Sequence, residues 1–242
     1  TGLVEGTPVI AGTVDGVAVA LEAGVFGPGT AVEMTGTSSV LLTSRAEGDP
    51  VPELISMSHA LKGQTVVCAA MSTTGASLKW FAEEVCGAGR SAGRTGGEEM
   101  FAWLNREAAG APIEHDIIFL PYMAGERSPH WDADARGVFF GLSLGSTRGA
   151  MIRAIMEGAA FALRQNLEII ERSGPPVRTL RLVGGTSKSL LWNQIKADVL
   201  HREIDVIEDS RGAPLGGAIL AGTAVGFYGD PGTVAARVTA RT

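Results

Sequence analysis

The chain has 242 residues, of which 45% are hydrophobic and 19% charged, and its formal net charge is −6. This composition can bury a sizeable core. Charges of both signs are interspersed without a basic run, so no nucleic-acid partner is expected. No apolar stretch approaches the roughly 20 residues that cross a bilayer, so no membrane partner is expected either. Cys68 and Cys86 lie in apolar contexts, which indicates buried free thiols in a cytoplasmic protein.

The organisation of the chain indicates a single domain over residues 1–242 that comes from a longer protein. The sequence starts at Thr1 within a Gly/Pro-rich approach to a strand, and it ends at Thr242 just after a helix-like stretch. No linker is long enough to separate independent domains, and no internal repeat is present. We therefore expect one lobe of a larger protein.

The hydrophobic pattern predicts an α/β fold with a mixed sheet, because hairpin-like strands give way to alternating helices and strands. We expect strands at residues 8–13, 31–34, 40–43, 55–61, 65–71, 117–120, 137–142, 179–183 and 203–207, the one at 117–120 being buried. We expect helices at residues 16–23, 74–85, 98–109, 147–173, 189–200 and 215–227. Residues 87–97, rich in Gly, Arg and Ser, predict a surface loop.

Three Gly/Thr/Ser turns follow strand-like runs, at residues 35–39, 72–77 and 184–189. A strand that stops at glycine lets backbone N–H groups and hydroxyls face one small anion. In the first turn, backbone donors at Gly36 to Ser38 and the hydroxyls of Thr37 and Ser38 suit the β- and γ-phosphates of a nucleotide. An ordinary hairpin turn is the alternative.

The second and third turns each precede a predicted helix. Gly75 in the second turn fits either a phosphate contact or a simple helix cap. Gly184 and Gly185 in the third turn suit a flat base or ribose lying against bare backbone. Three such turns in one chain predict a nucleotide site.

Asp15 is the candidate catalytic residue. It is the only acid in its apolar run, at the end of the first predicted strand and directly before Gly16. A carboxylate there can accept the proton of a hydroxyl whose oxygen attacks a phosphoryl group. It can equally cap the helix predicted to begin at Gly16.

Other motifs are either absent or open to two interpretations. The charged loop at residues 125–137 indicates a functional loop or a connection ordered by local ion pairs. There is no Walker A motif, no dinucleotide-binding GxGxxG and no protein-kinase His-Arg-Asp. The four His and two Cys have no metal-ligand spacing, so no metal site made by the protein alone is expected.

These motifs, in this order, resemble the C-terminal half of the FGGY carbohydrate kinases, the family of xylulokinase and glycerol kinase. The resemblance rests on residues 11–16, 35–38, 75–80, 125–129, 132–142, 153–158 and 184–189, which span nearly the whole chain. It implies an actin/hexokinase-like lobe of the ribonuclease-H type, which uses ATP with Mg²⁺ brought by the nucleotide. The stretch Gly-Glu-Arg-Ser-Pro at residues 125–129 favours a ketopentose such as xylulose as the substrate.

The resemblance also implies a role for each candidate residue. Asp15 would be the catalytic base, and Gly16 stands where many family members have a sugar-contacting Gln or Asn. The residues implied to bind ATP are Gly36, Thr37 and Ser38 at the phosphates and Gly75, Lys79, Gly185 and Ser189 around the nucleotide pocket.

Family members contain a further, N-terminal lobe with most of the sugar contacts. We therefore expect that lobe as a partner and expect the isolated chain to be inactive, because catalysis in this fold needs two lobes to close over the substrate. A homodimer remains open. Alternative functions are a kinase for glycerol, erythritol or a signalling sugar, and an actin-like lobe kept for binding alone. A nicotinamide-dependent oxidoreductase would need a different glycine arrangement.

Overall fold

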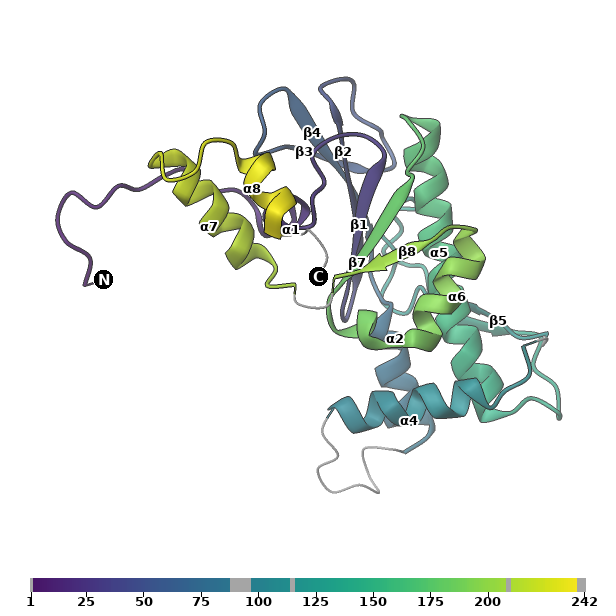
Figure 1. Ribbon diagram of the computed structural model, residues 1–242. Coiled ribbons are helices and arrows are strands. Elements are labelled where there is room, and N and C mark those ends of the chain that lie inside the picture. The colour runs from purple at the N-terminus through teal and green to yellow at the C-terminus, as the bar shows by residue number, and fades with distance from the viewer. Residues whose placement is uncertain (1, 88–96, 114–115, 208–209, 239–242) are drawn as a thin grey trace.

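In the computed structural model, which describes residues 2–87, 97–113, 116–207 and 210–238, a mixed sheet lies between two groups of helices (Figure 1). The six strands of the sheet follow the order β3-β4-β2-β1-β7-β8. They are β1 (Thr30–Thr35), β2 (Ser39–Ala46), β3 (Ile55–Ser58), β4 (Gln64–Met71), β7 (Thr179–Val183) and β8 (Ile204–Val206). The neighbours among β1 to β4 pair antiparallel, whereas β7 runs parallel to both β1 and β8. The predicted α/β fold with a mixed sheet is therefore confirmed.

Alternating side chains of the central strands build a core on each face of the sheet. Val32 and Leu42 pack with Val17 of α1 on one face, whereas Ala31 and Leu41 pack with Leu163 on the other. This alternation follows from the two-residue repeat of a β-strand. A strand with both faces covered explains why residues 66–71 of β4 are continuously apolar.

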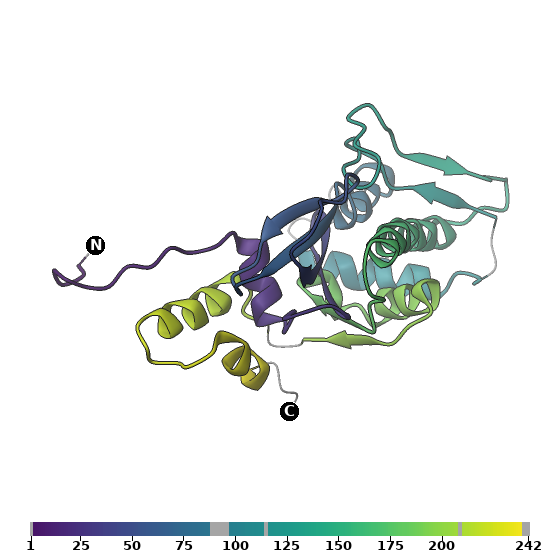
Figure 2. The ribbon, with the colours of Figure 1, turned by 90° about the horizontal axis from the view of Figure 1, so that it is seen from above.

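Helices cover both faces of the sheet, as the two views in Figures 1 and 2 show. One group consists of α1 (Asp15–Glu22), α7 (Ala213–Ala224) and α8 (Pro231–Val238). The other contains α5 (Arg148–Arg172) and α6 (Leu190–Leu200). On this second side, α2 (Gly75–Trp80), the π-helix η1 (Phe81–Val85) and α4 (Gly97–Ala109) pack with α5 and α6 in an apolar cluster that includes Leu78 and Leu104.

The longest helix begins and ends where the sequence predicts. Thr147 is the N-cap of α5, and its hydroxyl accepts a hydrogen bond from the backbone N–H of Ala150 at 3.2 Å. Ser173 is the C-cap, directly before Gly174-Pro175-Pro176. More than one stripe of α5 is buried, because the helix lies between the main sheet on one side and α4, α6 and β5 on the other.

The strand predicted at residues 117–120 is present, but the prediction that it is buried is wrong. Residues Ile118–Leu120 form β5, which pairs only with β6 (Val138–Phe140) in a separate two-stranded sheet. Phe119 faces the α5 cluster and is 2% exposed, whereas Ile118 and Leu120 on the opposite face are 55% and 40% exposed. The apolar run reflects a sheet with only one covered face.

The predicted strand at residues 8–13 is also wrong. This segment has no strand partner in the described part of the chain and extends away from the body (Figure 2). Val9 is 89% exposed. A β-strand forms its backbone hydrogen bonds with a neighbouring strand, and residues 8–13 have no such neighbour among the described residues. Apolar β-branched residues alone therefore do not make a strand.

Smaller differences concern element ends and exposure. The helix predicted at 215–227 lies at Ala213–Ala224, and the strand predicted at 55–61 ends at Ser58. Most of the predicted loop at 87–97 lies outside the described residues. Cys68 is buried and burial raises the pKa of its thiol to about 11, but Cys86 is only half-buried. Among the described residues, no helix is long and apolar enough to cross a membrane.

His59 joins the end of β3 to the loop after α1. Its Nδ1 accepts a hydrogen bond from the backbone N–H of Leu61 at 2.8 Å, and its Nε2 lies 3.0 Å from the carbonyl of Val25. Only a neutral ring can accept at Nδ1 and donate at Nε2 at the same time. Burial lowers the pKa of His59, and the bond to Val25 offsets this only in part.

This arrangement predicts acid sensitivity. A lowered folded pKa means that the unfolded chain binds more protons at pH values between that pKa and the ordinary value of about 6.5. The contribution of His59 to stability is therefore fully present above pH 6.5 and is lost as the pH drops toward the lowered pKa. Thermal unfolding of wild type and His59→Asn from pH 7.5 to 5 should show a flatter pH dependence in the variant. His201→Asn, at an exposed position, should behave like wild type; equal slopes in all three proteins would contradict the assignment.

Candidate functional site: a cavity between two glycine turns

A cavity with a volume of about 910 Å³ lies where two of the predicted turns meet. Both turns follow neighbouring parallel strands, since β1 precedes the turn at residues 36–38 and β7 precedes η2 (Gly185–Lys188). Helices α2, α4, α5 and α6 complete the walls. The lining residues are Gly36, Thr37, Gly75, Ala76, Leu78, Lys79, Trp80, Glu83, Glu84, Phe101, Ala102, Asn105, Met156, Gly185, Thr186, Lys188, Ser189 and Trp192.

Six of the predicted nucleotide-binding residues line this cavity. They are Gly36, Thr37, Gly75, Lys79, Gly185 and Ser189. Ser38, Asp15 and Gly16 are not among its lining residues. The fold therefore brings together segments about 150 residues apart, and a hydrogen bond from Thr186 to Thr35 joins them directly.

The first turn uses part of its backbone internally. The N–H of Gly36 donates to the carbonyl of Ser38 at 2.8 Å. The prediction of backbone donors for a phosphate at all three positions is therefore wrong for Gly36, because the tight turn occupies that N–H. Gly36 and Thr37 are exposed at the tip of the hairpin.

The second turn packs directly against the first. The carbonyl of Thr37 accepts from the N–H groups of Thr74 and Ala76, at 3.2 and 3.0 Å, so the hairpin tip caps the start of α2. Gly75 permits this contact, because a Cβ there would lie 2.2 Å from the carbonyl oxygen of Gly36. The cap interpretation of Gly75 is thus supported, with the cap supplied by a distant carbonyl.

The third turn combines a close backbone approach with an open surface. Gly184 has φ +98, and a Cβ there would lie 2.5 Å from the carbonyl oxygen of Thr35. At Gly185, by contrast, a Cβ would have no heavy atom within 4 Å, so its bare backbone faces open space in the cavity. Ser189 ends the turn: its Oγ accepts from the N–H of Trp192 at 3.1 Å and donates to Oδ1 of Asn105 on α4 at 2.6 Å.

Charged and aromatic groups complete the walls. Lys79 is exposed and lies 3.9 Å from Glu83, an exposed pair that contributes little to stability. Sequence reasoning did not assign Trp80, Phe101, Asn105, Lys188 or Trp192 to the site. In the sequence, Phe101 and Trp192 are recognisable only as apolar positions of amphipathic helices. Such positions face the core in most helices, so they do not indicate a ligand site.

A buried ion pair was also missed. Nζ of Lys196 on α6 lies 2.7 Å from Oε2 of Glu33 on β1, and both side chains are 2% exposed. The residues are 163 positions apart. Neither the isolated acid in β1 nor the lysine within an amphipathic helix distinguishes this pair from solvent-exposed charges in the sequence.

Asp15 lies at a second, smaller cavity of about 430 Å³, between residues 10–15 and helix α7. It is the first residue of α1, and its Oδ1 accepts from the N–H of Gly16 at 2.7 Å. The helix thus begins one residue earlier than expected, with Val14 as its N-cap. The carboxylate is exposed, which leaves it accessible to a substrate.

The charged loop at 125–137 is ordered chiefly by bonds to backbone. Glu126 is 5% exposed, and its Oε1 accepts from the N–H groups of Ser72 and Arg127, both at 2.7 Å. Arg127 donates to the carbonyl of Met71 at 3.1 Å. These contacts attach the charged loop to the end of β4 and to the start of the second turn. The expected network of local ion pairs is therefore wrong for Glu126 and Arg127, whose side chains are used on backbone groups.

No group of three or more His, Cys, Asp or Glu residues that could hold a metal ion occurs in the described ranges. The cavity instead offers hydroxyls, backbone groups and the lysines Lys79 and Lys188. Two carboxylates, Glu83 and Glu84, also line the cavity, and Glu83 lies 3.9 Å from Lys79. The hydroxyls, backbone N–H groups and lysines are the part of the lining that suits an anion.

A mixed sheet flanked by helices, with two glycine turns meeting at one cavity, defines an α/β lobe with a candidate nucleotide site. The chain belongs to the FGGY family of carbohydrate kinases, because residues 31–225 match the sequence model of that family's C-terminal domain. It is 30% identical over 231 residues to the xylulose kinase of Bacillus subtilis strain 168, covering 94% of this chain and 44% of that protein.

Solved structures of carbohydrate kinases share the fold of this chain. The xylulose kinase of Rhodospirillum rubrum is 32% identical, with a TM-score of 0.82 over 97% of this chain and 46% of that one. A glycerol kinase of Plasmodium falciparum with ADP is 22% identical and shares the fold, with a TM-score of 0.78 over 93% of this chain and 44% of that one. The chain thus spans less than half the length of the relatives described here.

Proposed function

We propose that the protein containing this chain transfers the γ-phosphoryl group of ATP to a hydroxyl of a sugar or polyol, a ketopentose such as xylulose being the favoured substrate. The observation that carries the proposal is the cavity of about 910 Å³, lined by six residues expected to bind the nucleotide. Membership of a carbohydrate-kinase family and an ADP-bound relative support it.

In this proposal the chain's own residues act by binding, orientation and proton transfer. Thr37 and Ser38 at the hairpin tip bind phosphate oxygens, while the open backbone at Gly185 accepts the base or ribose. Gly75, Lys79 and Ser189 complete the nucleotide pocket. The Asp15 carboxylate takes the proton of the substrate hydroxyl as that oxygen bonds to phosphorus and the bond to ADP breaks. Mg²⁺ is expected to arrive on the nucleotide phosphates, where it neutralises charge.

The sugar and its contacts belong partly to the rest of the protein. Because the chain spans 44% of its xylulose kinase relative, we propose the activity for a protein with both lobes. The isolated chain is expected to lack turnover, and Gly16 is proposed to lie beside the sugar. Xylulose is favoured because of the Gly-Glu-Arg-Ser-Pro stretch at residues 125–129, and a glycerol kinase among the relatives supports another polyol as the alternative. The free thiols of Cys68 and Cys86 fit a cytoplasmic enzyme.

A substitution at Gly185 tests the nucleotide site. Gly185→Val places a side chain where no heavy atom lies within 4 Å of the Cβ, so it should fill cavity space without disturbing the fold. We expect the Kd for Mg-ADP in calorimetric titration to rise at least about tenfold, as obstruction of a bound ligand costs 1.4 kcal/mol or more.

Gly229→Val is the matched control. Gly229 also has no atom within 4 Å of an added Cβ, but it lies after α7 and outside the cavity lining. It should bind Mg-ADP like wild type. Absence of Mg-ADP binding by wild type, or equal affinity in all three proteins, would contradict the assignment of this cavity as a nucleotide site.

A further inference from the structure

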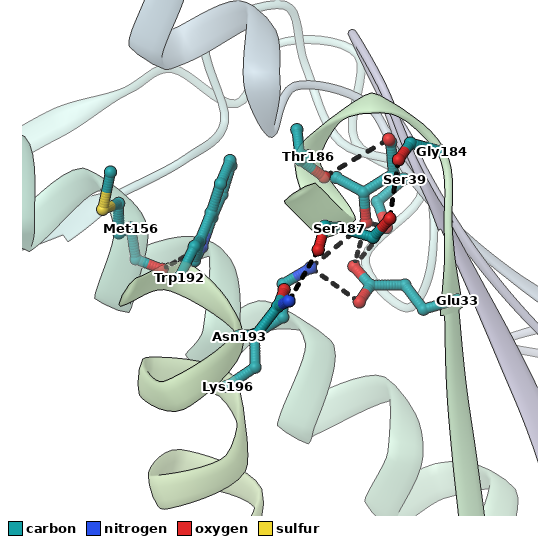
Figure 3. A network of polar contacts seen from close by, with 10 residues as sticks. Glu33, Ser39, Met156, Gly184, Thr186, Ser187, Trp192, Asn193 and Lys196 are labelled. Carbon is teal, nitrogen blue, oxygen red and sulfur yellow. Dashed lines mark hydrogen bonds and ion pairs between the residues drawn. The ribbon is translucent and has the colours of Figure 1, made fainter. Parts of the chain in front are cut away.

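We infer that the buried pair Glu33–Lys196 is a positioning device that holds the two nucleotide turns at a fixed separation; the inference rests on the proposed nucleotide site. Neither residue lines the cavity of about 910 Å³. Figure 3 shows the pair beneath the third turn, with Lys196 reaching from α6 toward the carboxylate of Glu33. Its action on a nucleotide must therefore be indirect.

Glu33 ties together both ends of the first turn. Its Oε1 accepts from Oγ1 of Thr35 at 2.5 Å and from Oγ of Ser39 at 2.7 Å. Thr35 is the last residue of β1 and Ser39 the first of β2, so the two donors flank the tip at residues 36–38. The two hydroxyls also lie 3.2 Å apart. One carboxylate oxygen thus fixes the base of the hairpin.

Lys196 connects this base to α6. Its Nζ donates to Oε2 of Glu33 at 2.7 Å and to Oγ1 of Thr35 at 3.3 Å, and it lies 5.2 Å from the centroid of the Trp192 ring. A charge pair that is 2% exposed on both sides is hardly screened by water, so its geometry is tightly restrained.

The same helix also holds the third turn. Nδ2 of Asn193 donates to the carbonyl of Ser187 at 2.7 Å, and Ser189 caps the helix. Thr186 donates to the carbonyl of Thr35 at 3.3 Å, which joins the two turns directly. Helix α6 is therefore attached to one turn through Lys196 and to the other through Asn193. Binding groups held this way lose little freedom when a ligand arrives.

A stable fold does not require this pair to be charged. Replacing a buried ion pair by uncharged residues is often neutral for stability, whereas removing one partner leaves a buried charge unpaired. A charged link that spans 163 positions and joins two binding turns is better explained by the geometry that it imposes. This distinction makes the inference testable.

The test compares Lys196→Met, Glu33→Gln/Lys196→Met and Asn193→Ala with wild type. Lys196→Met should lower both the melting temperature and the affinity for Mg-ADP. The double variant keeps a side-chain oxygen at position 33 that can accept from Thr35 and Ser39, so its melting temperature should recover toward that of wild type. Its Kd for Mg-ADP should nevertheless stay raised on the order of tenfold, because binding groups that are no longer held in place must be ordered when the ligand binds. Asn193→Ala, outside the cavity lining, should raise the Kd through the third turn alone.

Gln194→Met is the control on the same helix. It removes an exposed hydrogen bond to Asp198 and should leave the Kd unchanged. Wild-type affinity in the recovered double variant and in Asn193→Ala would overturn the positioning role while leaving the nucleotide site intact. Failure of wild type to bind Mg-ADP would instead overturn the proposed function, and the positioning role with it.

Discussion

Replacement of Asp15 by Asn should lower kcat by about 10²–10⁴ in the protein that contains both lobes, which is the usual contribution of a general base. Asn keeps an oxygen that can accept from the N–H of Gly16, so the start of α1 should be preserved. Asp15 does not line the larger cavity, so the Kd for Mg-ADP should stay within about twofold of wild type, a change below 0.5 kcal/mol. A steady-state kinase assay beside calorimetry separates the two effects.

The control for charge is Glu5→Gln, which removes another exposed acid from the same N-terminal segment. It should retain wild-type turnover. If Asp15→Asn turned over at a rate within a few-fold of wild type, Asp15 would be a helix-start residue only, and another base would be required.

Gly75→Ala should destabilise the fold at the contact between the first and second turns. The added Cβ would lie 2.2 Å from the carbonyl oxygen of Gly36, a backbone atom that cannot move without breaking the contacts of Thr37 with α2. Overpacking of this kind costs about 1–3 kcal/mol. The melting temperature should fall by about 2–12 °C, given about 2–4 °C per kcal/mol for a chain of this size. The affinity for Mg-ADP should fall as well, because the hairpin tip is displaced.

Gly185→Ala is the informative comparison for Gly75→Ala in thermal unfolding. The same methyl group is added at the other glycine turn, but with no heavy atom within 4 Å. Its melting temperature should match that of wild type. Equal destabilisation by the two substitutions would show that the contact between Gly75 and Gly36 does not constrain the fold.

Much of the fold follows from local sequence signals. The 3.6-residue pattern of α5, with Thr147 before it and Gly174-Pro175-Pro176 after it, determines both ends of that helix. The pattern at residues 8–13 misleads, because a strand depends on a partner that no local signal provides. For the same reason, the one-sided exposure of β5 could not be predicted from its apolar run.

The glycine turns gave the clearest signal for the site, and the structure brings those at residues 35–39 and 184–189 to one cavity. Backbone geometry demands glycine at Gly75 and Gly184, where an added Cβ would meet a backbone oxygen. The walls made by Phe101 and Trp192 carry no such signal, since an aromatic residue at helical spacing fits a core equally well. The Glu33–Lys196 pair depends on tertiary contact across 163 positions, which residue type alone does not encode.

The parallel pairing of β1 with β7 has a consequence for the order of folding. Thr30 pairs with Thr179. Of the strands between β1 and β7 in sequence, β2, β3 and β4 lie on the other side of β1, and β5 and β6 form a separate sheet. The hairpin of β1 and β2 is local and can form early, but closing the long loop to β7 carries a large entropic cost. During synthesis, the first turn is therefore made long before its opposite wall exists. The cavity is completed only when α6 has emerged and can dock, so the N-terminal and C-terminal parts of the chain must fold cooperatively to make a single binding site.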